Sequence, residues 1–494
     1  MRYFSTRGAE QLLSFEETVL TGLAPNGGLY IPERIPSLPA DWEERWRDYS
    51  FQDLSVEILS LYISPSEISR DELRTLVDKS YSTFRHPEIS PLKQLSDKTY
   101  VLELFHGPTF AFKDVALQLL GNLFEFFLVR RNSRKGPGEK REKLTVVGAT
   151  SGDTGRGRVS PIQEAQMTTV ADANVHNLAV RGTFDDCQDA VKALFADTAF
   201  NARHRLGAVN SINWARILAQ TVYYFLAHFH ARRAHQLPQG AQLQFVVPTG
   251  NFGDVLAGYY AKRMGLPMGK LVIATNANDI LARFWRSGAY EKVDSAPSPE
   301  PRDGHPRLEQ LERLLWYLAY EEQGASADDA ARVRAACATV DSWMRAVKVD
   351  GRVQVPTAVL EAARRDFVAE RISDEQTLET IRSYYGSSPP YIADPHTAVG
   401  LCAAGLVSPH NAPSTVQVVL STAHPAKFSE AVTRALAGEP SFDFAQDVLP
   451  EEFRGLLERE RRVEDVPNDI EAVKAVIERY VGDGRAAVEK GASV

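Results

Sequence analysis

A strand-to-helix junction decides the fold: His106-Gly107-Pro108-Thr109-Phe110-Ala111-Phe112-Lys113-Asp114. The extended apolar run Tyr100-Val-Leu-Glu-Leu-Phe105 leads into it, and apolar residues at helical spacing follow it as far as Leu128. Asp114 is of a residue type that caps helix starts. A strand, a loop and a helix in this order predict one unit of an α/β protein.

Lys113 stands in this junction among aromatic residues. A lysine in an apolar setting can have its pKa lowered towards neutrality, and its amine is then a nucleophile able to form a Schiff base. A lysine that extends along the surface from a helix start fits the same local pattern. Both interpretations stay open on this stretch alone.

The bulk properties exclude several classes of protein. The chain has 494 residues, 44% of them hydrophobic and 24% charged, which is typical of a globular protein with a large core. A formal net charge of -8 disfavours binding to nucleic acid or to a membrane surface. No stretch approaches the roughly 20 apolar residues of a membrane span, and no secretory signal is visible. Three scattered cysteines predict neither a disulfide framework nor a metal site. We therefore expect a cytoplasmic protein.

The predicted secondary structure changes near residue 99, from mostly helices to alternating strands and helices. Residues 1–95 are expected to be mostly helical, and helices are expected to prevail again at 309–387 and in the charged tail from 447. Between these segments we expect strands at 100–105, 143–149, 175–181, 242–248, 270–275 and 415–421, with helices at 114–131, 184–197, 214–235, 253–264 and 279–288. This alternation indicates parallel α/β layers, which bind ligands beyond the carboxyl ends of their strands.

Three loops that follow predicted strands carry candidate chemistry. GATSGDTG at 148–155 offers small residues and hydroxyls that can close around an anion. PTGNFGD at 248–254 precedes a helix, whose N-terminus suits a phosphate. LSTAHPAK at 420–427 offers hydroxyls that can face a ring nitrogen or a substrate. Each is also compatible with an ordinary turn or cap, as is DPHTAVG at 394–400. Together with Lys113, they provide what a pyridoxal phosphate enzyme needs from its protein.

Eight motifs occur in order: HGPTFAFKD, GATSGDTG, SPIQEAQM, VNSINWARILAQ, PTGNFGD, ATNANDIL, DPHTAVG and STAHPAKF. The chain thereby resembles the threonine synthases of the fungal and bacterial type over most of its length. The resemblance implies a fold-type II pyridoxal phosphate enzyme, similar to tryptophan synthase β, with parallel and mixed sheets flanked by helices. The domains implied are an N-terminal helical domain at 1–95, a small cofactor subdomain at 96–205, a large domain at 206–446 with a helical insertion at 309–387, and a helical tail at 447–494.

The resemblance also implies a reaction. O-phospho-L-homoserine and water become L-threonine and phosphate, by γ-elimination and β-addition of water, in threonine biosynthesis. Lys113 matches the lysine that holds the cofactor and moves protons at the substrate α and β carbons. No metal is implied, and a monomer is compatible with the sequence.

The same resemblance assigns the binding residues. Thr422 matches the residue that faces the pyridine nitrogen. The cofactor-phosphate loop matches Gly250, Asn251, Phe252, Gly253 and Asp254. The loop that meets the substrate carboxylate matches Thr150, Ser151, Asp153 and Thr154.

Two segments depart from the family pattern. In the family a helix and a strand follow SGDTG, whereas here Gly155 is followed directly by Arg156-Gly-Arg-Val-Ser-Pro161. On the order of 20 residues are therefore missing, since a parallel crossover needs a dozen or more. Residues 296–308 also differ from the family segment before Glu312-Arg-Leu-Leu-Trp316. An unfilled strand position leaves apolar neighbours uncovered, so we hypothesise that the activity of this chain is impaired.

Two other interpretations remain. The chain could be another fold-type II enzyme, such as a serine or threonine deaminase or a β-replacing synthase. It could also be a non-catalytic, degenerate copy. Phosphate release from phosphohomoserine, measured against ammonia release from serine, separates the enzymes. Covalent attachment of the cofactor to Lys113 separates an enzyme from a degenerate copy.

Overall fold

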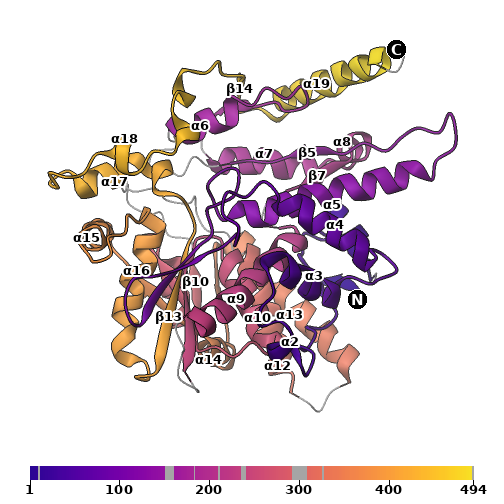
Figure 1. Cartoon of the computed structure of the whole chain (residues 1–494). Helices are drawn as coiled ribbons and strands as arrows, with labels where there is room; N and C mark the ends of the chain where they lie inside the picture. The colour runs from indigo at the N-terminus through magenta and orange to yellow at the C-terminus, as the bar shows by residue number, and fades with distance from the viewer. Residues whose placement is uncertain are drawn as a thin grey trace. The chain divides into compact units, whose positions relative to one another are not determined.

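A computed structural model describes residues 1–8, 12–150, 161–182, 184–209, 212–234, 241–291, 309–324 and 328–491. The chain forms two compact units (Figure 1). Unit 1 comprises Met1–Phe127, Ser211–Ala296 and Pro306–Phe442, and unit 2 comprises Leu128–Asn210, Pro297–His305 and Asp443–Val494. The four domains expected from the sequence stay a prediction.

The sheet of unit 1 has six strands in the order β12-β9-β8-β13-β4-β3. Neighbours run parallel, except that β3 is antiparallel to β4. All residues of β9 and β13 are buried, as expected of central parallel strands. The α/β fold is thus confirmed, and the carboxyl ends of the parallel strands meet at one edge. The strands are β3 Leu92–Gln94, β4 Thr99–Glu103, β8 Gln242–Pro248, β9 Leu271–Thr275, β12 Phe367–Arg371 and β13 Thr415–Ser421.

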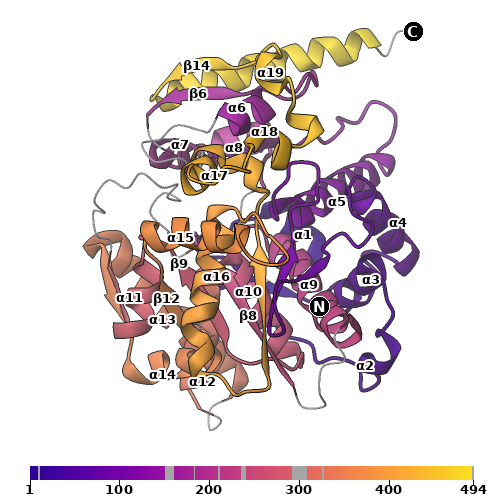
Figure 2. The ribbon, with the colours of Figure 1, turned by 60° about the vertical axis from the view of Figure 1, so that its left-hand side comes forward.

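Helices pack on this sheet and on one another. Helix α16 (Pro395–Val407) lies across β13, β8 and β9 (Figure 2). It approaches so closely at Gly400 that a Cβ there would lie 2.7 Å from a methyl of Val419. Helix α10 (Gly253–Met264) packs against α9 (Trp214–Ala234) and against β8 and β9.

The remaining elements of unit 1 complete its helical layers and two short antiparallel pairs. The pairs are β1 Tyr3–Ser5 with β2 Tyr30–Pro32, and β10 Ala289–Glu291 with β11 Arg352–Gln354. The helices are α1 Phe15–Thr21, α2 Trp42–Arg45, α3 Phe51–Tyr62, α4 Arg70–Tyr81, α5 Lys113–Ser133, which ends in unit 2, α11 Ile280–Ser287, α12 Glu309–Glu322, α13 Asp329–Asp350, α14 Thr357–Asp366, α15 Asp374–Tyr385, α17 Ser429–Leu436, and the 3-10 helices η1 Ser408–His410 and η2 Pro425–Phe428.

One expectation for this unit is wrong. Helices prevail at 309–387 as expected, but no strand was expected there, and the structure has the short strand β11 and the strand β12, which lies at the edge of the sheet with Val368 opposite Val272. Alanine, glutamate and arginine favour a helix locally. Pairing with β9 overrides that preference. The strands at 242–248 and 415–421 and the helix at 253–264 are confirmed to the residue.

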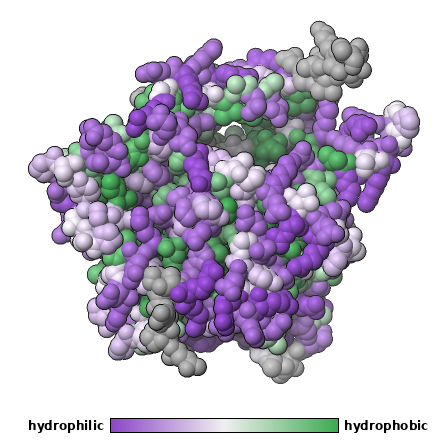
Figure 3. Space-filling model, in the orientation of Figure 1, coloured by the Kyte–Doolittle hydropathy of each residue, from purple (hydrophilic) through white to green (hydrophobic). Residues whose placement is uncertain are grey.

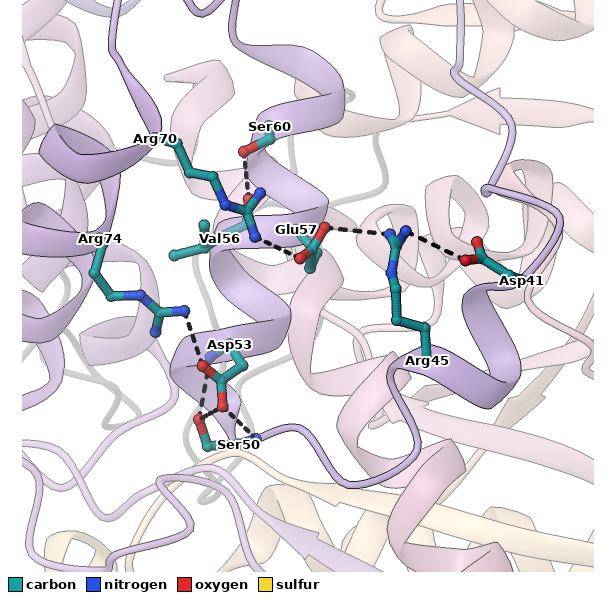
Figure 4. A network of polar contacts seen from close by, with 9 residues as sticks. All are labelled: Asp41, Arg45, Ser50, Asp53, Val56, Glu57, Ser60, Arg70 and Arg74. Atoms are coloured by element: carbon teal, nitrogen blue, oxygen red, sulfur yellow. Dashed lines mark hydrogen bonds and ion pairs between the residues drawn. The ribbon is translucent and has the colours of Figure 1, made fainter.

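The N-terminal helices are joined at their surface by a polar network (Figure 4). At the start of α3, the Ser50 hydroxyl accepts from the Asp53 amide, and the Asp53 carboxylate accepts from the Ser50 amide. Ion pairs then link α2, α3 and α4: Arg70–Glu57 at 2.5 Å, Arg45–Glu57 at 3.4 Å and Arg74–Asp53 at 2.8 Å. Because these side chains reach solvent, each pair stabilises the fold by at most about 1 kcal/mol.

A buried arginine ties α12 to two distant segments. Arg313 is fully buried, and its Nε donates to the Tyr30 carbonyl at 2.9 Å and a terminal nitrogen to the Ile212 carbonyl at 2.7 Å. We expect Arg313→Met to lower the free energy of unfolding by about 3 kcal/mol, because buried carbonyls lose their donors. Urea denaturation measures the loss. Arg345→Met, at an exposed site on α13, is the control, and an equal loss in both variants would contradict the prediction.

Unit 2 contains two separate two-stranded sheets among its described residues. Strand β5 (Thr145–Val147) is parallel to β7 (Leu206–Ala208), and β6 (Leu178–Arg181) is parallel to β14 (Glu464–Pro467). The helices are α6 Pro161–Thr168, α7 Phe184–Ala196, α8 Thr198–His204, α18 Phe444–Asp447, α19 Ile470–Gly491, and the 3-10 helices η3 Glu451–Phe453 and η4 Leu456–Glu458. The charged tail from 447 was expected to be helical, and this is wrong at 451–462, because Gly455 adopts a positive φ of 68° and the chain forms only these short 3-10 turns.

The strands β5 and β6 are only partly covered by other residues that the structure describes. No residue of either strand is buried, and Val146 is 47% exposed. Parallel strands are normally covered on both faces within larger sheets. Within the described part of unit 2, each of these strands has one neighbour, so its other edge is open. This is the arrangement expected if a strand after Gly155 is missing.

Within the described ranges, no helix is both long and apolar enough for a membrane span. Figure 3 shows a face on which hydrophilic residues predominate and hydrophobic residues are scattered.

Candidate active site

Lys113 is the first residue of α5 and follows the loop that leaves β4. The apolar setting expected for its amine is not what the structure shows, since the Lys113 side chain is exposed. The buried aromatic residue of the junction is Phe110, whose φ of 59° turns the chain so that its ring packs on His424, with centroids 5.4 Å apart. A positive φ in a bulky residue is strained, and such strain gathers at functional sites.

Asp114 was expected to cap α5, and this is wrong because the helix already begins at Lys113. The Asp114 carboxylate is buried and accepts from the Thr109 amide and the Thr109 hydroxyl, both at 2.7 Å. It also lies against Gly107, where a Cβ would come within 2.4 Å of the Asp114 Cβ, so only glycine fits. Asp114 thus closes the loop onto the helix and determines where Lys113 emerges.

The loop after β13 runs antiparallel to this junction. The Phe112 amide donates to the Thr422 carbonyl at 2.8 Å, and the His424 amide donates to the Phe110 carbonyl at 3.1 Å. The Lys427 amine donates to the Thr109 carbonyl at 2.7 Å. These bonds hold Lys113 and Thr422 beside each other at one edge of the sheet.

His424 has a structural role in this loop. Its Nδ1 accepts from the Ala426 amide at 3.2 Å, which caps η2. Burial lowers the pKa of His424 to about 4, so the ring is neutral at physiological pH.

Thr422 is buried, and its hydroxyl donates to no side chain or carbonyl that the structure describes. The preceding hydroxyl, on Ser421, lies 2.8 Å from that of Thr397. Asp394 caps α16, as the sequence predicts, by accepting from the amides of His396 and Thr397. Thr422 therefore differs from its neighbours in having a hydroxyl that remains available to a ligand.

The loop after β8 presents backbone amides. Its start is anchored where the Thr249 amide donates to the Ala274 carbonyl at 2.8 Å. Its end is anchored by Phe252, which is buried with a φ of 62° and stacks on Trp285 at 5.6 Å. Between residues 250 and 255, no backbone N–H donates to another residue that the structure describes. Free amides at the start of α10, together with the helix dipole, make a binding site for a phosphate.

The Asp254 side chain does not face solvent. It is buried and does not cap α10, because its Oδ1 accepts from the hydroxyls of Tyr223 and Tyr224 on α9. Burial raises the pKa of Asp254 to about 7, against the hydrogen bonds from the two tyrosines, which lower it. Sequence reasoning missed both tyrosines, since two aromatic residues in an apolar helix give no functional signal.

The strand order brings the predicted residues together. β13 lies between β8 and β4, so Thr422 follows the middle strand, with Lys113 to one side and the loop at 250–254 to the other. Adjacent strands lie about 4.8 Å apart, so roughly 10 Å separates the two outer positions, a span that suits a small phosphorylated cofactor. Thr150 is exposed in unit 2. Ser151, Asp153 and Thr154, and the altered segment at 296–308, lie outside the described residues.

A lysine, a hydroxyl and an amide-lined phosphate loop at the carboxyl edge of one parallel sheet define the class of fold-type II pyridoxal phosphate enzymes. Residues 2–81 match the model of the threonine synthase N terminus, and residues 397–477 match that of the threonine synthase C-terminal part. The chain belongs to the threonine synthase family. Curated relatives in this family are named threonine synthases, and a solved one is bound to pyridoxal phosphate.

Three relatives support this assignment. Threonine synthase from Schizosaccharomyces pombe is 52% identical, covering 96% of this chain and 97% of its own. The crystal structure of threonine synthase from yeast has a TM-score of 0.89 and 46% identity, over 98% of this chain and 99% of its own. The pyridoxal phosphate-bound threonine synthase from Brucella melitensis has a TM-score of 0.81 and 37% identity, over 97% of this chain and 99% of its own.

The alignment with the Schizosaccharomyces pombe protein extends over 511 positions, although this chain has 494 residues. The relative therefore carries residues that have no counterpart here. A shortened segment after Gly155 is consistent with that difference.

Proposed function

We propose that this chain binds pyridoxal phosphate at the carboxyl edge of the unit 1 sheet and converts O-phospho-L-homoserine and water into L-threonine and phosphate. The observation that carries the proposal is the strand order β8-β13-β4, which aligns the loop at 250–254, Thr422 and Lys113. Phosphate release from phosphohomoserine tests it. Ammonia release from serine or threonine in its place would instead support a deaminase.

The bound cofactor supplies an electron sink for the substrate α carbon. Lys113 would hold the cofactor covalently, and its free amine would move protons at the substrate α and β carbons. The amides of Gly250, Asn251, Phe252 and Gly253, with that of Asp254, would hold the cofactor phosphate. Thr422 would face the pyridine nitrogen, where a hydroxyl, as a very weak acid, would leave the nitrogen unprotonated.

Two further groups position Lys113 without touching the substrate. Asp114 holds Thr109, and Lys427 holds the carbonyl of the same residue, so both stabilise the turn from which Lys113 emerges. We propose that the substrate carboxylate binds to Thr150, Ser151, Asp153 and Thr154. The missing segment should support this loop, so we propose that turnover is lower in this chain than in its relatives.

We propose a cytoplasmic setting for the enzyme. The net charge of -8 and the absence of a membrane-spanning helix within the described ranges support a cytoplasmic location, with a small-molecule substrate and no nucleic-acid partner. A monomer is compatible with these properties.

Thr422→Val is expected to lower kcat/KM about 10-fold, because one neutral hydrogen bond contributes about 0.5–1.5 kcal/mol. Thr422→Ser keeps the hydroxyl and should keep most of the activity. Thr415→Val is the matched control, because Thr415 is equally buried at the opposite end of β13. Steady-state phosphate release measures the effect. Equal activity in the two valine variants would disprove the role of Thr422.

A further inference from the structure

One buried carboxyl group at the start of α10 has an unusual environment. Asp254 is 6% exposed and forms no ion pair with a residue that the structure describes. Its Oδ1 accepts from the hydroxyls of Tyr223 and Tyr224, the latter at 3.3 Å. Its Oδ2 is completely buried and has no hydrogen-bond partner among the described residues. A buried oxygen without a donor fits the hydroxyl of a neutral carboxylic acid better than a carboxylate.

The charged groups of the elements packed against α10 do not neutralise Asp254. On α9, the charge of Arg216 acts on Tyr223, and the groups that shift the pKa of Asp254 besides burial are Tyr223 and Tyr224. On α12, Glu312 is paired with Arg7 at 2.7 Å, and Arg313 donates to backbone carbonyls. The strands β8 and β9 carry no acidic or basic residue. The two tyrosines are thus the groups that hydrogen-bond to the Asp254 carboxyl.

This carboxyl belongs to the helix turn whose amides would face the cofactor phosphate. A negative charge there would repel a phosphate anion bound to the same amides. At a separation of about 8 Å and an effective dielectric constant of about 20, two unit charges change affinity on the order of 30-fold.

We propose that Asp254 is a positioning residue that stays neutral while the cofactor phosphate is bound, and that its ionisation weakens cofactor binding. The inference rests on the proposed function, because it needs a phosphorylated cofactor at this loop. Since burial raises the pKa of Asp254 to about 7, the carboxyl is neutral below that pH and ionised above it. Cofactor affinity should therefore fall as the pH rises.

The test is equilibrium dialysis of pyridoxal phosphate with the cofactor-free protein and its Asp254→Asn variant, in which the side chain cannot ionise. From about pH 6 to about pH 8.5, the dissociation constant of the wild type should rise 10- to 30-fold more than that of D254N. Contributions from Lys113 and from the cofactor's own phosphate are common to both proteins and cancel in this ratio. Parallel profiles would overturn the inference.

Pyridoxal, which lacks the phosphate, is the matched probe. Its affinity should show the same pH dependence in the wild type and in D254N, because the repulsion needs the phosphate. A difference that persists with pyridoxal would show that Asp254 acts on folding or on Lys113 instead. If pyridoxal phosphate binds to neither protein at any pH, the proposed function itself fails.

A second variant keeps the test independent of how well D254N folds. The tyrosine hydroxyls stabilise the ionised carboxylate and so lower the pKa of Asp254. Tyr223→Phe removes one of them, and the fall in cofactor affinity should then move to higher pH. A shift to lower pH, or none, contradicts the inference.

Discussion

Lys113→Ala is expected to abolish covalent attachment of the cofactor and to lower turnover by roughly 10⁴-fold, the upper range for loss of a positioned proton-transfer group. Because the Lys113 side chain is exposed, its removal should leave the stability of unit 1 almost unchanged. Borohydride reduction followed by peptide mass spectrometry locates the cofactor. Phosphate release from phosphohomoserine measures turnover.

Two other lysines serve for comparison in this experiment, one as a control variant and one as a competing attachment site. Lys79→Ala is the control, because Lys79 is also exposed and pairs with Glu125 at 2.6 Å, away from the loop of Lys113. Lys427 lies close to the same loop, but its amine is largely buried and donates to the Thr109 carbonyl. A reduced cofactor found on Lys427 of the wild type, rather than on Lys113, would disprove the assignment.

Restoring the shortened segment is expected to have the opposite effect. Inserting after Gly155 the residues that the Schizosaccharomyces pombe relative carries there should raise kcat/KM on the order of 100-fold, the loss expected when reacting groups are misplaced by about 1 Å. The physical reason is that β5 and β6 each have one neighbouring strand among the described residues, so each has an unpaired edge there. A strand added to these edges would cover residues such as Val146 and support the loop that begins at Thr150.

Hydrogen exchange separates a repaired sheet from a merely longer loop. Amides at 145–147 and 178–181 should exchange more slowly in the restored chain, because the added strand supplies hydrogen-bond partners. An insertion of equal length made of glycine and serine is the control and should change neither exchange nor turnover. If the present chain already turns over as fast as the relative, the hypothesis of impairment is wrong.

The sequence predicted the ends of two buried strands to the residue. Strands β8 and β13 are runs of apolar residues bounded by turn signals, so their ends, and with them Gly250 and Thr422, could be located from local pattern. The roles of Asp114 and Asp254 could not. Both stand in the first turn of a helix, where the sequence predicts that an acidic residue caps the helix. Each instead accepts hydrogen bonds inside the protein, from Thr109 and from Tyr223, and the local spacing of residues does not reveal these partners.

By itself, then, the sequence determined the class of fold and the family, and it predicted Lys113 as the cofactor lysine and a missing segment after Gly155, because these depend on short motifs and on the periodicity of neighbouring residues. Only the tertiary structure decided that Phe367–Arg371 is a strand and that Lys427 holds the loop of Lys113. It alone also showed that Asp254 accepts hydrogen bonds from two tyrosine hydroxyls and forms no ion pair among the residues that the structure describes. These features depend on contacts between residues distant in the chain, whose energies override local preference once the sheet has formed.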